Sequence, residues 1–159
     1  MAEAFSAGIL LFRRGKEGVE VLVGHMGGPF WARKDLGAWS VPKGGYVPGE
    51  EEARAAAGRE FVEELGVPVP EGEWIALGEV EYGSGSKRKT VQVWAIEADL
   101  DPAVIEPGTF EMEWPPRSGK TAAFPEIDRV AWFGLDTAGE KLTKGQAPFV
   151  QRLAELLGG

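Results

Sequence analysis

The most informative stretch of the chain runs from Gly45 to Val67 and reads GYVPGEEEARAAAGREFVEELGV. Its end carries three carboxylates at helical spacing, because Glu63 and Glu64 lie three and four residues after Glu60. At about 100° per residue, these side chains fall within an arc of about 100° on one helix face. Like charges this close destabilise an isolated helix. The pattern is therefore typical of a shared cation, and hard carboxylate oxygens favour Mg²⁺ or Mn²⁺ over zinc.

A purely structural interpretation of the same segment is an exposed amphipathic helix. Its alanines are good helix formers, Glu50 to Glu52 suit the positive end of the helix dipole, and Gly66 suits the left-handed residue that ends a helix. None of these features explains the clustered carboxylates, since a structural helix more often has Lys or Arg in its last turn. The sequence predicts a helix from about Glu50 or Glu51 to Leu65.

The segment resembles the signature of the Nudix hydrolases. That pattern is Gly, five residues, Glu, seven residues, Arg-Glu, an apolar residue, any residue, Glu-Glu, any residue, Gly and an apolar residue. Every specified position is filled, by Gly45, Glu51, Arg59, Glu60, Phe61, Glu63, Glu64, Gly66 and Val67. The preceding loop also permits a register from Gly44 to Glu50, so the first Glu of the motif is Glu51 or Glu50.

The resemblance implies attack of water at phosphorus in a nucleoside diphosphate linked to another group, X, with Mg²⁺ or Mn²⁺ as cofactor. It implies that Glu60 and Glu64 bind the metal, and that Glu63 is a metal ligand, a general base, or both in turn. Arg59 stands four residues before Glu63, so we expect it to orient this carboxylate through a bidentate pair. The alternative for Arg59 is an ordinary surface salt bridge.

Further metal-binding positions are implied outside the helix. Family members often bind metal through a backbone carbonyl in the loop before the helix, which points to Gly44 and Gly45, where glycine permits close approach. Many members add an acidic residue from elsewhere in the chain. Glu126 is the first candidate for that role, with Glu111 and Glu113 as rivals. The structural alternatives are a tight turn for the glycines and a surface carboxylate for Glu126.

A substrate-binding role is predicted for several basic and aromatic residues. Lys43 stands in WSVPKG at 39–44, which resembles the lead-in of diadenosine tetraphosphate hydrolases, and an ammonium there can hold a phosphate. Tyr82 precedes a Gly-Ser turn, where its ring can stack on a nucleobase. The basic residues expected to line the same groove are Lys87, Lys89 and Arg117. Each alone is typical of a solvated surface charge, and Tyr82 of a core or rim position.

Composition limits the classes of function. The chain has 159 residues, no Cys and a formal net charge of −8. The length suits one domain over residues 1–159, and the lack of Cys excludes thiolate metal sites. The acidic balance argues against a nucleic-acid polymer as partner but permits a small phosphorylated substrate. No signal peptide or apolar span is evident, so we expect a cytoplasmic protein without a membrane partner. The resemblance leaves a homodimer open.

Apolar patterning predicts a mixed order of strands and helices. Strands are expected at 5–13, 20–25, 39–41, 73–82, 90–97 and 129–133, and a C-terminal helix from Pro148. The segment 107–125 is interpreted as a long connection, with a short strand at 110–114 as an option. This order fits an α+β domain with a mixed sheet between helices, in agreement with the Nudix α/β/α sandwich that the resemblance implies.

The predicted function is a divalent-metal-dependent pyrophosphohydrolase. Residues 7–14 (AGILLFRR), 39–44 and 89–97 (KTVQVWAIE) resemble diadenosine tetraphosphate hydrolases, which favours dinucleoside polyphosphates. Loops 26–37 and 109–125 depart from that group, so nucleoside triphosphates, ADP-ribose-type compounds and inositol polyphosphates remain alternatives. A different class of function is a nucleotide-sensing module without catalysis. Such modules usually lose motif carboxylates, and all of them are present here.

Overall fold

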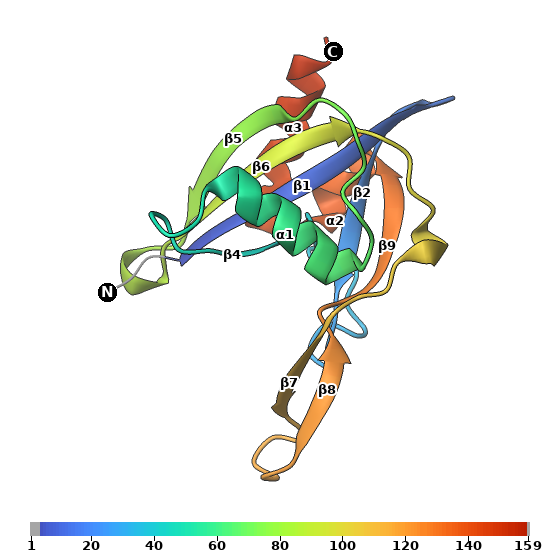
Figure 1. Cartoon of the computed structure of the whole chain (residues 1–159). Helices are drawn as coiled ribbons and strands as arrows, with labels where there is room; N and C mark the ends of the chain where they lie inside the picture. The colour runs from blue at the N-terminus through green and yellow to red at the C-terminus, as the bar shows by residue number, and fades with distance from the viewer. Residues whose placement is uncertain (1–3, 159) are drawn as a thin grey trace.

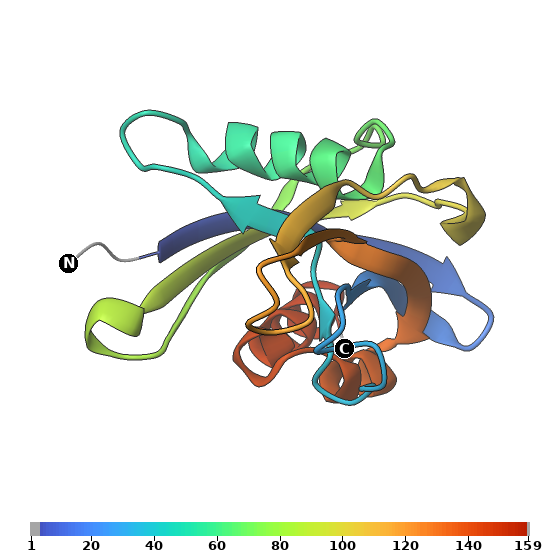
Figure 2. The same cartoon turned by 90° about the horizontal axis from the view of Figure 1, so that it is seen from below.

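The computed structural model describes residues 4–158, which form three layers with a seven-stranded mixed sheet in the middle. One helix covers one face of the sheet and two helices cover the other (Figures 1 and 2). This arrangement confirms the α/β/α sandwich predicted from the sequence. Among the described residues, no helix is long and apolar enough to cross a bilayer.

The first strand, β1 (Ala4–Gly15), organises the sheet because it pairs with three others. It runs antiparallel to β2 (Gly18–Met26) and β4 (Lys43–Gly45), and parallel to β6 (Lys89–Glu97). The remaining strands are β5 (Ile75–Tyr82), which pairs with β6, and β3 (Trp39–Ser40) and β9 (Ile127–Gly134), which both pair with β2. The central position of β1 places its N-terminal half directly beside the segment that precedes α1.

Alternation along β1 builds a core on each face of the sheet. Leu10 and Phe12 join the cluster beneath the C-terminal helices, whereas Ile9 and Leu11 join the cluster beneath α1. All four side chains are buried. A strand covered on both faces reads as a continuous apolar run, which is the pattern at the start of this sequence.

The helix of the acidic motif, α1, spans Ala53–Leu65 and begins later than predicted. Glu50 and Glu51 lie in the preceding turn, where both backbone N–H groups donate to the Val47 carbonyl. Gly66 ends the helix with φ 69°, as the sequence indicated. The other helices are α2 (Leu135–Lys141), which the sequence did not predict, and α3 (Ala147–Leu156), close to the predicted C-terminal helix.

The segment 107–125 contains a β-hairpin in place of the long connection that was predicted, and the optional short strand at 110–114 corresponds to the first strand of this hairpin. Its strands, β7 (Thr109–Glu113) and β8 (Thr121–Pro125), form a separate two-stranded sheet that projects from the body (Figure 1). The loop 27–37 packs against it, with the rings of Phe30 and Trp114 edge to face at a centroid distance of 5.7 Å. The two segments that depart from the resembled diadenosine tetraphosphate hydrolases thus pack against each other.

Candidate functional site

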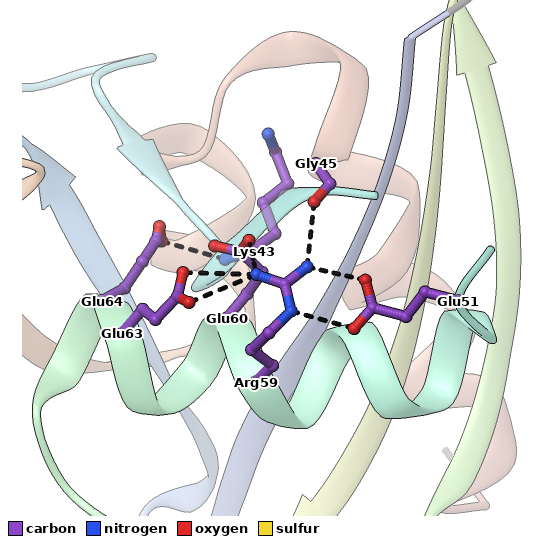
Figure 3. A network of polar contacts seen from close by, with 7 residues as sticks. All are labelled: Lys43, Gly45, Glu51, Arg59, Glu60, Glu63 and Glu64. Atoms are coloured by element: carbon purple, nitrogen blue, oxygen red, sulfur yellow. Dashed lines mark hydrogen bonds and ion pairs between the residues drawn. The ribbon is translucent and has the colours of Figure 1, made fainter. Parts of the chain in front are cut away.

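The acidic face of α1 is turned toward β4 (Figure 3). Glu60 and Glu64 are each only 9% exposed, although both are acidic. Glu63, on the same face, has an exposed side chain. Burial of two carboxylates on one helix is costly unless cations or hydrogen bonds compensate them, so this face differs from an ordinary solvated surface.

Arg59 connects the carboxylates of the motif through one guanidinium group (Figure 3). Its Nε and Nη2 donate to the two oxygens of Glu51 at 2.9 Å each, which is a bidentate pair. Its Nη1 donates to Glu60 at 2.6 Å and lies farther from Glu63, at 3.3 and 3.4 Å. The bidentate partner is therefore Glu51, and the predicted bidentate pair with Glu63 is wrong. These contacts raise the pKa of Arg59 and lower that of Glu51.

The same contacts decide which residue is the first Glu of the motif. Glu51 lies two residues before the helix, within reach of Arg59, whereas Glu50 is exposed in the loop. The chain reverses at Gly49, where φ is 92°. Because the helix begins at Ala53, Glu51 faces the acidic side from outside the helix rather than from its first turn.

The two loop glycines approach the acidic face closely. A Cβ on Gly44 would lie 1.9 Å from Glu60 Oε1, so any larger residue would have to displace that carboxylate from its observed position. The Gly45 carbonyl accepts a hydrogen bond from Arg59 Nη2 at 3.2 Å. Both glycines thus lie where the sequence placed them, at the edge of the carboxylate cluster.

Glu64 is the most strongly perturbed carboxyl of the cluster. Burial raises its pKa to about 8, and the nearby charges of Glu126 and Glu60 act in the same direction. A hydrogen bond from the Lys43 backbone N–H, at 3.1 Å, opposes this shift. A buried carboxyl whose pKa is raised this far by burial and by neighbouring carboxylates is typical of a functional site.

Glu126 lies close enough to the helix to sense its charges. Partial burial and the carboxylates of Glu60 and Glu63 raise the pKa of Glu126. Of its rivals, Glu113 accepts hydrogen bonds from two backbone N–H groups in the β7–β8 turn, and Glu111 is exposed in mid-strand. The structure therefore brings Glu126 to the acidic centre and leaves Glu111 and Glu113 on the hairpin.

The donor set suits a hard divalent cation. It combines carboxylates from α1 and from Glu126 with backbone carbonyls of the Gly44–Gly45 loop, and oxygen-only sets of this kind fit Mg²⁺ or Mn²⁺. Within residues 4–158, no three His, Cys, Asp or Glu side chains are already grouped as a finished metal site. In this arrangement, the guanidinium of Arg59 contacts Glu60 and Glu63.

Lys43 separates the acidic centre from a basic region. Its backbone N–H faces Glu64, whereas its side chain extends to the other side of β4, away from α1 (Figure 3). Burial lowers the pKa of Lys43, the nearby charge of Lys89 acts in the same direction, and the carboxylates of Glu64 and Glu60 oppose the shift. Two ammonium groups held near each other favour a polyanion between them.

The predicted aromatic and basic residues meet beside this region. An open hollow of about 500 Å³ is lined by Ala4, Tyr82, Ser86, Lys87, Arg88 and Lys89. The ring of Tyr82 packs against Gly145, where a Cβ would lie 2.8 Å from the ring, and burial raises the pKa of its hydroxyl. Arg117 is not part of this group, since it lies in the exposed β7–β8 turn with φ 63°.

Gln146 is a buried residue near the site that sequence reasoning missed. Its Oε1 accepts a hydrogen bond from the Val41 N–H at 2.8 Å, and its Nε2 donates to Ser40 Oγ at 3.0 Å. It thereby ties the end of β3 to the segment before α3. No local pattern could reveal this role, because Gln146 and Val41 are far apart in the sequence.

Comparison with known proteins agrees with this geometry. A sequence model of the NUDIX domain matches residues 3–153. The chain belongs to the NUDIX family. It is a Nudix hydrolase, an enzyme that acts on phosphoanhydride bonds, and members of this family generally use divalent metal ions. No curated protein matches this NUDIX chain significantly in sequence.

Solved structures share the fold of this NUDIX chain. A Caenorhabditis elegans Ap4A hydrolase in a binary complex has a TM-score of 0.68 and 19% identity, with 98% of each chain covered. The NUDIX domain of Shewanella oneidensis NrtR, in complex with ADP ribose, has a TM-score of 0.64 and 16% identity over 99% of this chain and 90% of that one. A MutT protein from Methanosarcina mazei has a TM-score of 0.61 and 18% identity, with 100% and 99% covered. At these identities the likeness shows the fold alone.

Proposed function

We propose that this Nudix hydrolase is a Mg²⁺- or Mn²⁺-dependent pyrophosphohydrolase that cleaves a nucleoside diphosphate linked to X, with dinucleoside polyphosphates such as diadenosine tetraphosphate as its substrates. The observation that carries the proposal is the pairing of two unlike surfaces across β4. Buried carboxylates lie on the α1 side, and Lys43, Lys89 and Tyr82 lie on the other. A nucleotide polyphosphate needs both kinds of surface.

The metal is proposed to bind Glu60, Glu64 and Glu126, together with a backbone carbonyl of the Gly44–Gly45 loop. Glu63 is proposed to act in turn as a metal ligand and as the general base. The fit rests on the oxygen donors and on the room that Gly44 leaves for Glu60, where a Cβ would lie 1.9 Å from the carboxylate. When bound, the cation would offset charge on the phosphates.

Glu63 is the residue proposed to take the proton from the attacking water. Its side chain is 55% exposed, so a water can reach it, whereas Glu60 and Glu64 face β4 and are buried. Arg59 contacts it at 3.3 Å while binding Glu51 and Glu60, which restricts the position of the carboxylate. A general base must lie within direct or one-water reach of the proton it removes.

The proposed substrate class rests on the basic region. Lys43 and Lys89 suit a chain of phosphates, and the Tyr82 hollow suits a nucleobase, since stacking on an aromatic ring contributes about 1–3 kcal/mol per base. The fold similarity to an Ap4A hydrolase over 98% of both chains supports the same choice. The chain is accordingly proposed to act as one domain on a small nucleotide and not on a nucleic-acid polymer.

A hydrolysis screen tests this proposal. Diadenosine tetraphosphate, canonical and oxidised nucleoside triphosphates, ADP-ribose and inositol polyphosphates would be incubated with Mg²⁺ or Mn²⁺ and the products separated by chromatography. We expect ATP plus AMP from diadenosine tetraphosphate at the highest kcat/KM. Preference for another compound would overturn the substrate class. Absence of turnover, together with tight binding of one nucleotide, would favour the sensing function.

A further inference from the structure

We propose that the β7–β8 hairpin positions Glu126 against α1, and that Gly27 and Gly108 are its positioning residues. The inference rests on the proposed function, because it requires Glu126 to act together with the carboxylates of α1. Neither glycine belongs to the acidic motif, and the hairpin lies in one of the segments that depart from the resembled hydrolases.

A chain of backbone hydrogen bonds links the end of α1 to Glu126. The Gly108 N–H donates to the Glu63 carbonyl at 3.1 Å, and the Glu126 N–H donates to the Gly108 carbonyl at 2.8 Å. On the other side, the Gly27 N–H donates to the Glu126 carbonyl at 3.0 Å. Glu126 is thus held from both sides by main-chain groups, and one of these connections leads through a single residue to Glu63.

The glycines are required by close packing at two of these contacts. A Cβ on Gly108 would lie 2.7 Å from the Glu63 carbonyl oxygen, and a Cβ on Gly27 would lie 1.8 Å from the Pro125 carbonyl oxygen. Both contacts are with backbone, which cannot move aside as a flexible side chain can. Any larger residue must therefore displace either the end of α1 or the segment that carries Glu126.

The hairpin explains how Gly108 and Glu126 are brought together. The first pair of its ladder, Thr109 with Pro125, directly follows Gly108 and directly precedes Glu126. Formation of the hairpin therefore sets the distance between the two residues. Loss of pairing in the hairpin would therefore free Glu126 from its hydrogen-bonded connection to α1.

An isolated two-stranded hairpin is marginally stable, so this one needs support from other residues. Phe110 and Phe124 face each other at 6.1 Å, and Gly28 leaves room for the Phe110 ring, which lies 3.1 Å from a hypothetical Cβ. Phe30 packs on Trp114 although it remains 60% exposed. These aromatic contacts lie outside both core clusters and stabilise the hairpin itself.

Mn²⁺ binding without substrate tests the inference, with free Mn²⁺ measured by electron paramagnetic resonance. The full chain would be compared with Gly108→Ala, Glu126→Ala and the double variant. We expect Gly108→Ala to weaken Mn²⁺ binding about tenfold, as is usual when a group that orients a ligand is lost. In the Glu126→Ala background, the same substitution should cause no further loss. Gly139→Ala, where a Cβ meets nothing within 4 Å, is the matched control.

Each outcome decides between the proposals. If Gly108→Ala weakens Mn²⁺ binding equally in the unaltered chain and in the Glu126→Ala variant, Gly108 acts on α1 and the inference is overturned. Unchanged Mn²⁺ binding by folded Gly108→Ala would also overturn it. Absence of Mn²⁺ binding by the unaltered chain would overturn the proposed function and the inference together. If Gly108→Ala does not fold, Phe30→Ala replaces it, because this exposed ring supports only the hairpin. It should weaken Mn²⁺ binding less than Gly108→Ala does, because it acts on Glu126 only through the hairpin, and only while Glu126 is present.

Discussion

The two sides of β4 are assembled in different ways. On one side, Glu60, Glu63 and Glu64 come from a single helix of 13 residues, and their relative positions follow from helix geometry. On the other side, Lys43, Lys89 and Tyr82 come from β4, β6 and β5, which the sheet brings together because β4 and β6 both pair with β1 and β5 pairs with β6. The candidate metal site is therefore encoded locally, whereas the proposed substrate site is encoded by the topology of the sheet. The two sides should therefore respond differently to substitution.

The largest effect is expected for Glu63→Gln, which should lower kcat by at least about a hundredfold, because general bases contribute about 10²–10⁴-fold. The exposed side chain means that the midpoint of thermal unfolding should hardly change. Steady-state kinetics and a thermal melt of the same preparation measure both. The control is Glu50→Gln, a carboxylate of the neighbouring loop that lies outside the cluster. Equal activity of the two variants would contradict the role of Glu63.

The next effect is expected for Arg59→Lys, which keeps the charge but removes the fork that binds Glu51. Since lysine cannot form a bidentate pair, we expect kcat to fall about 10–100-fold with a smaller change in KM. Glu51→Gln should show a similar loss, and combining the two should add little because they break one contact. Full additivity in this double-mutant cycle would show that the pair with Glu51 does not carry the effect.

On the opposite side of β4, Lys89→Ala should act on binding rather than on chemistry. Loss of one charge-assisted contact to phosphate, about 1.5–3 kcal/mol, should raise KM about tenfold or more while kcat changes little. Lys16→Ala, in the distant β1–β2 turn, is the matched control for loss of one positive charge. A fall in kcat without a change in KM would show that the two sides of β4 are not separate in function.

The smallest effect is a pH dependence of stability that comes from Glu64. Burial raises its pKa from 4.5 to about 8 in the folded chain, so folding favours the protonated carboxyl. This stabilisation is complete below about pH 4.5 and is lost as the pH rises to about 8. We expect the metal-free chain to melt at a lower temperature at pH 8 than at pH 5, because ionising the buried carboxyl costs free energy in the folded state.

Glu64→Gln removes the titrating group and provides the comparison for this prediction. Its melting temperature should fall less than that of the unaltered chain between pH 5 and pH 8, in a chelator-containing buffer. Identical slopes for both proteins would mean that Glu64 is ionised in the folded state at pH 5. Adding Mn²⁺ should reduce the pH dependence of the unaltered chain, because a bound cation favours the ionised carboxylate.

Much of the fold could be predicted because its main strands and α1 have strong local patterns. β4 was missed because Lys43-Gly44-Gly45 has no strand signal and is held by pairing with β1 alone. α2 was missed because it is seven residues long and contains Gly139. The hairpin was missed because β8 begins with TAAF, which shows no clear alternation.

For the candidate site, local residues were predicted better than contacts. The spacing placed Glu60, Glu63 and Glu64 on one face, but it gave Arg59 the wrong bidentate partner, because Glu51 lies in a turn whose path the sequence does not show. Lys89 was expected near Lys43 only as one of several basic residues. Its position depends on the β1–β6 pairing, which no local pattern reveals.

The parallel pairing of β1 with β6 also bears on how the protein is made. The partner of Ala4 is Lys89, so β1 leaves the ribosome long before the strand that will cover its edge exists. At synthesis rates of about 5–20 residues per second, this apolar strand waits for several seconds with unpaired backbone groups. Contacts of such long sequence separation also slow folding. We therefore expect nascent chains that end before β6 to be aggregation-prone and to depend on chaperones. The acidic helix is synthesised before β6, and therefore before the hollow beside Tyr82 and Lys89 can form.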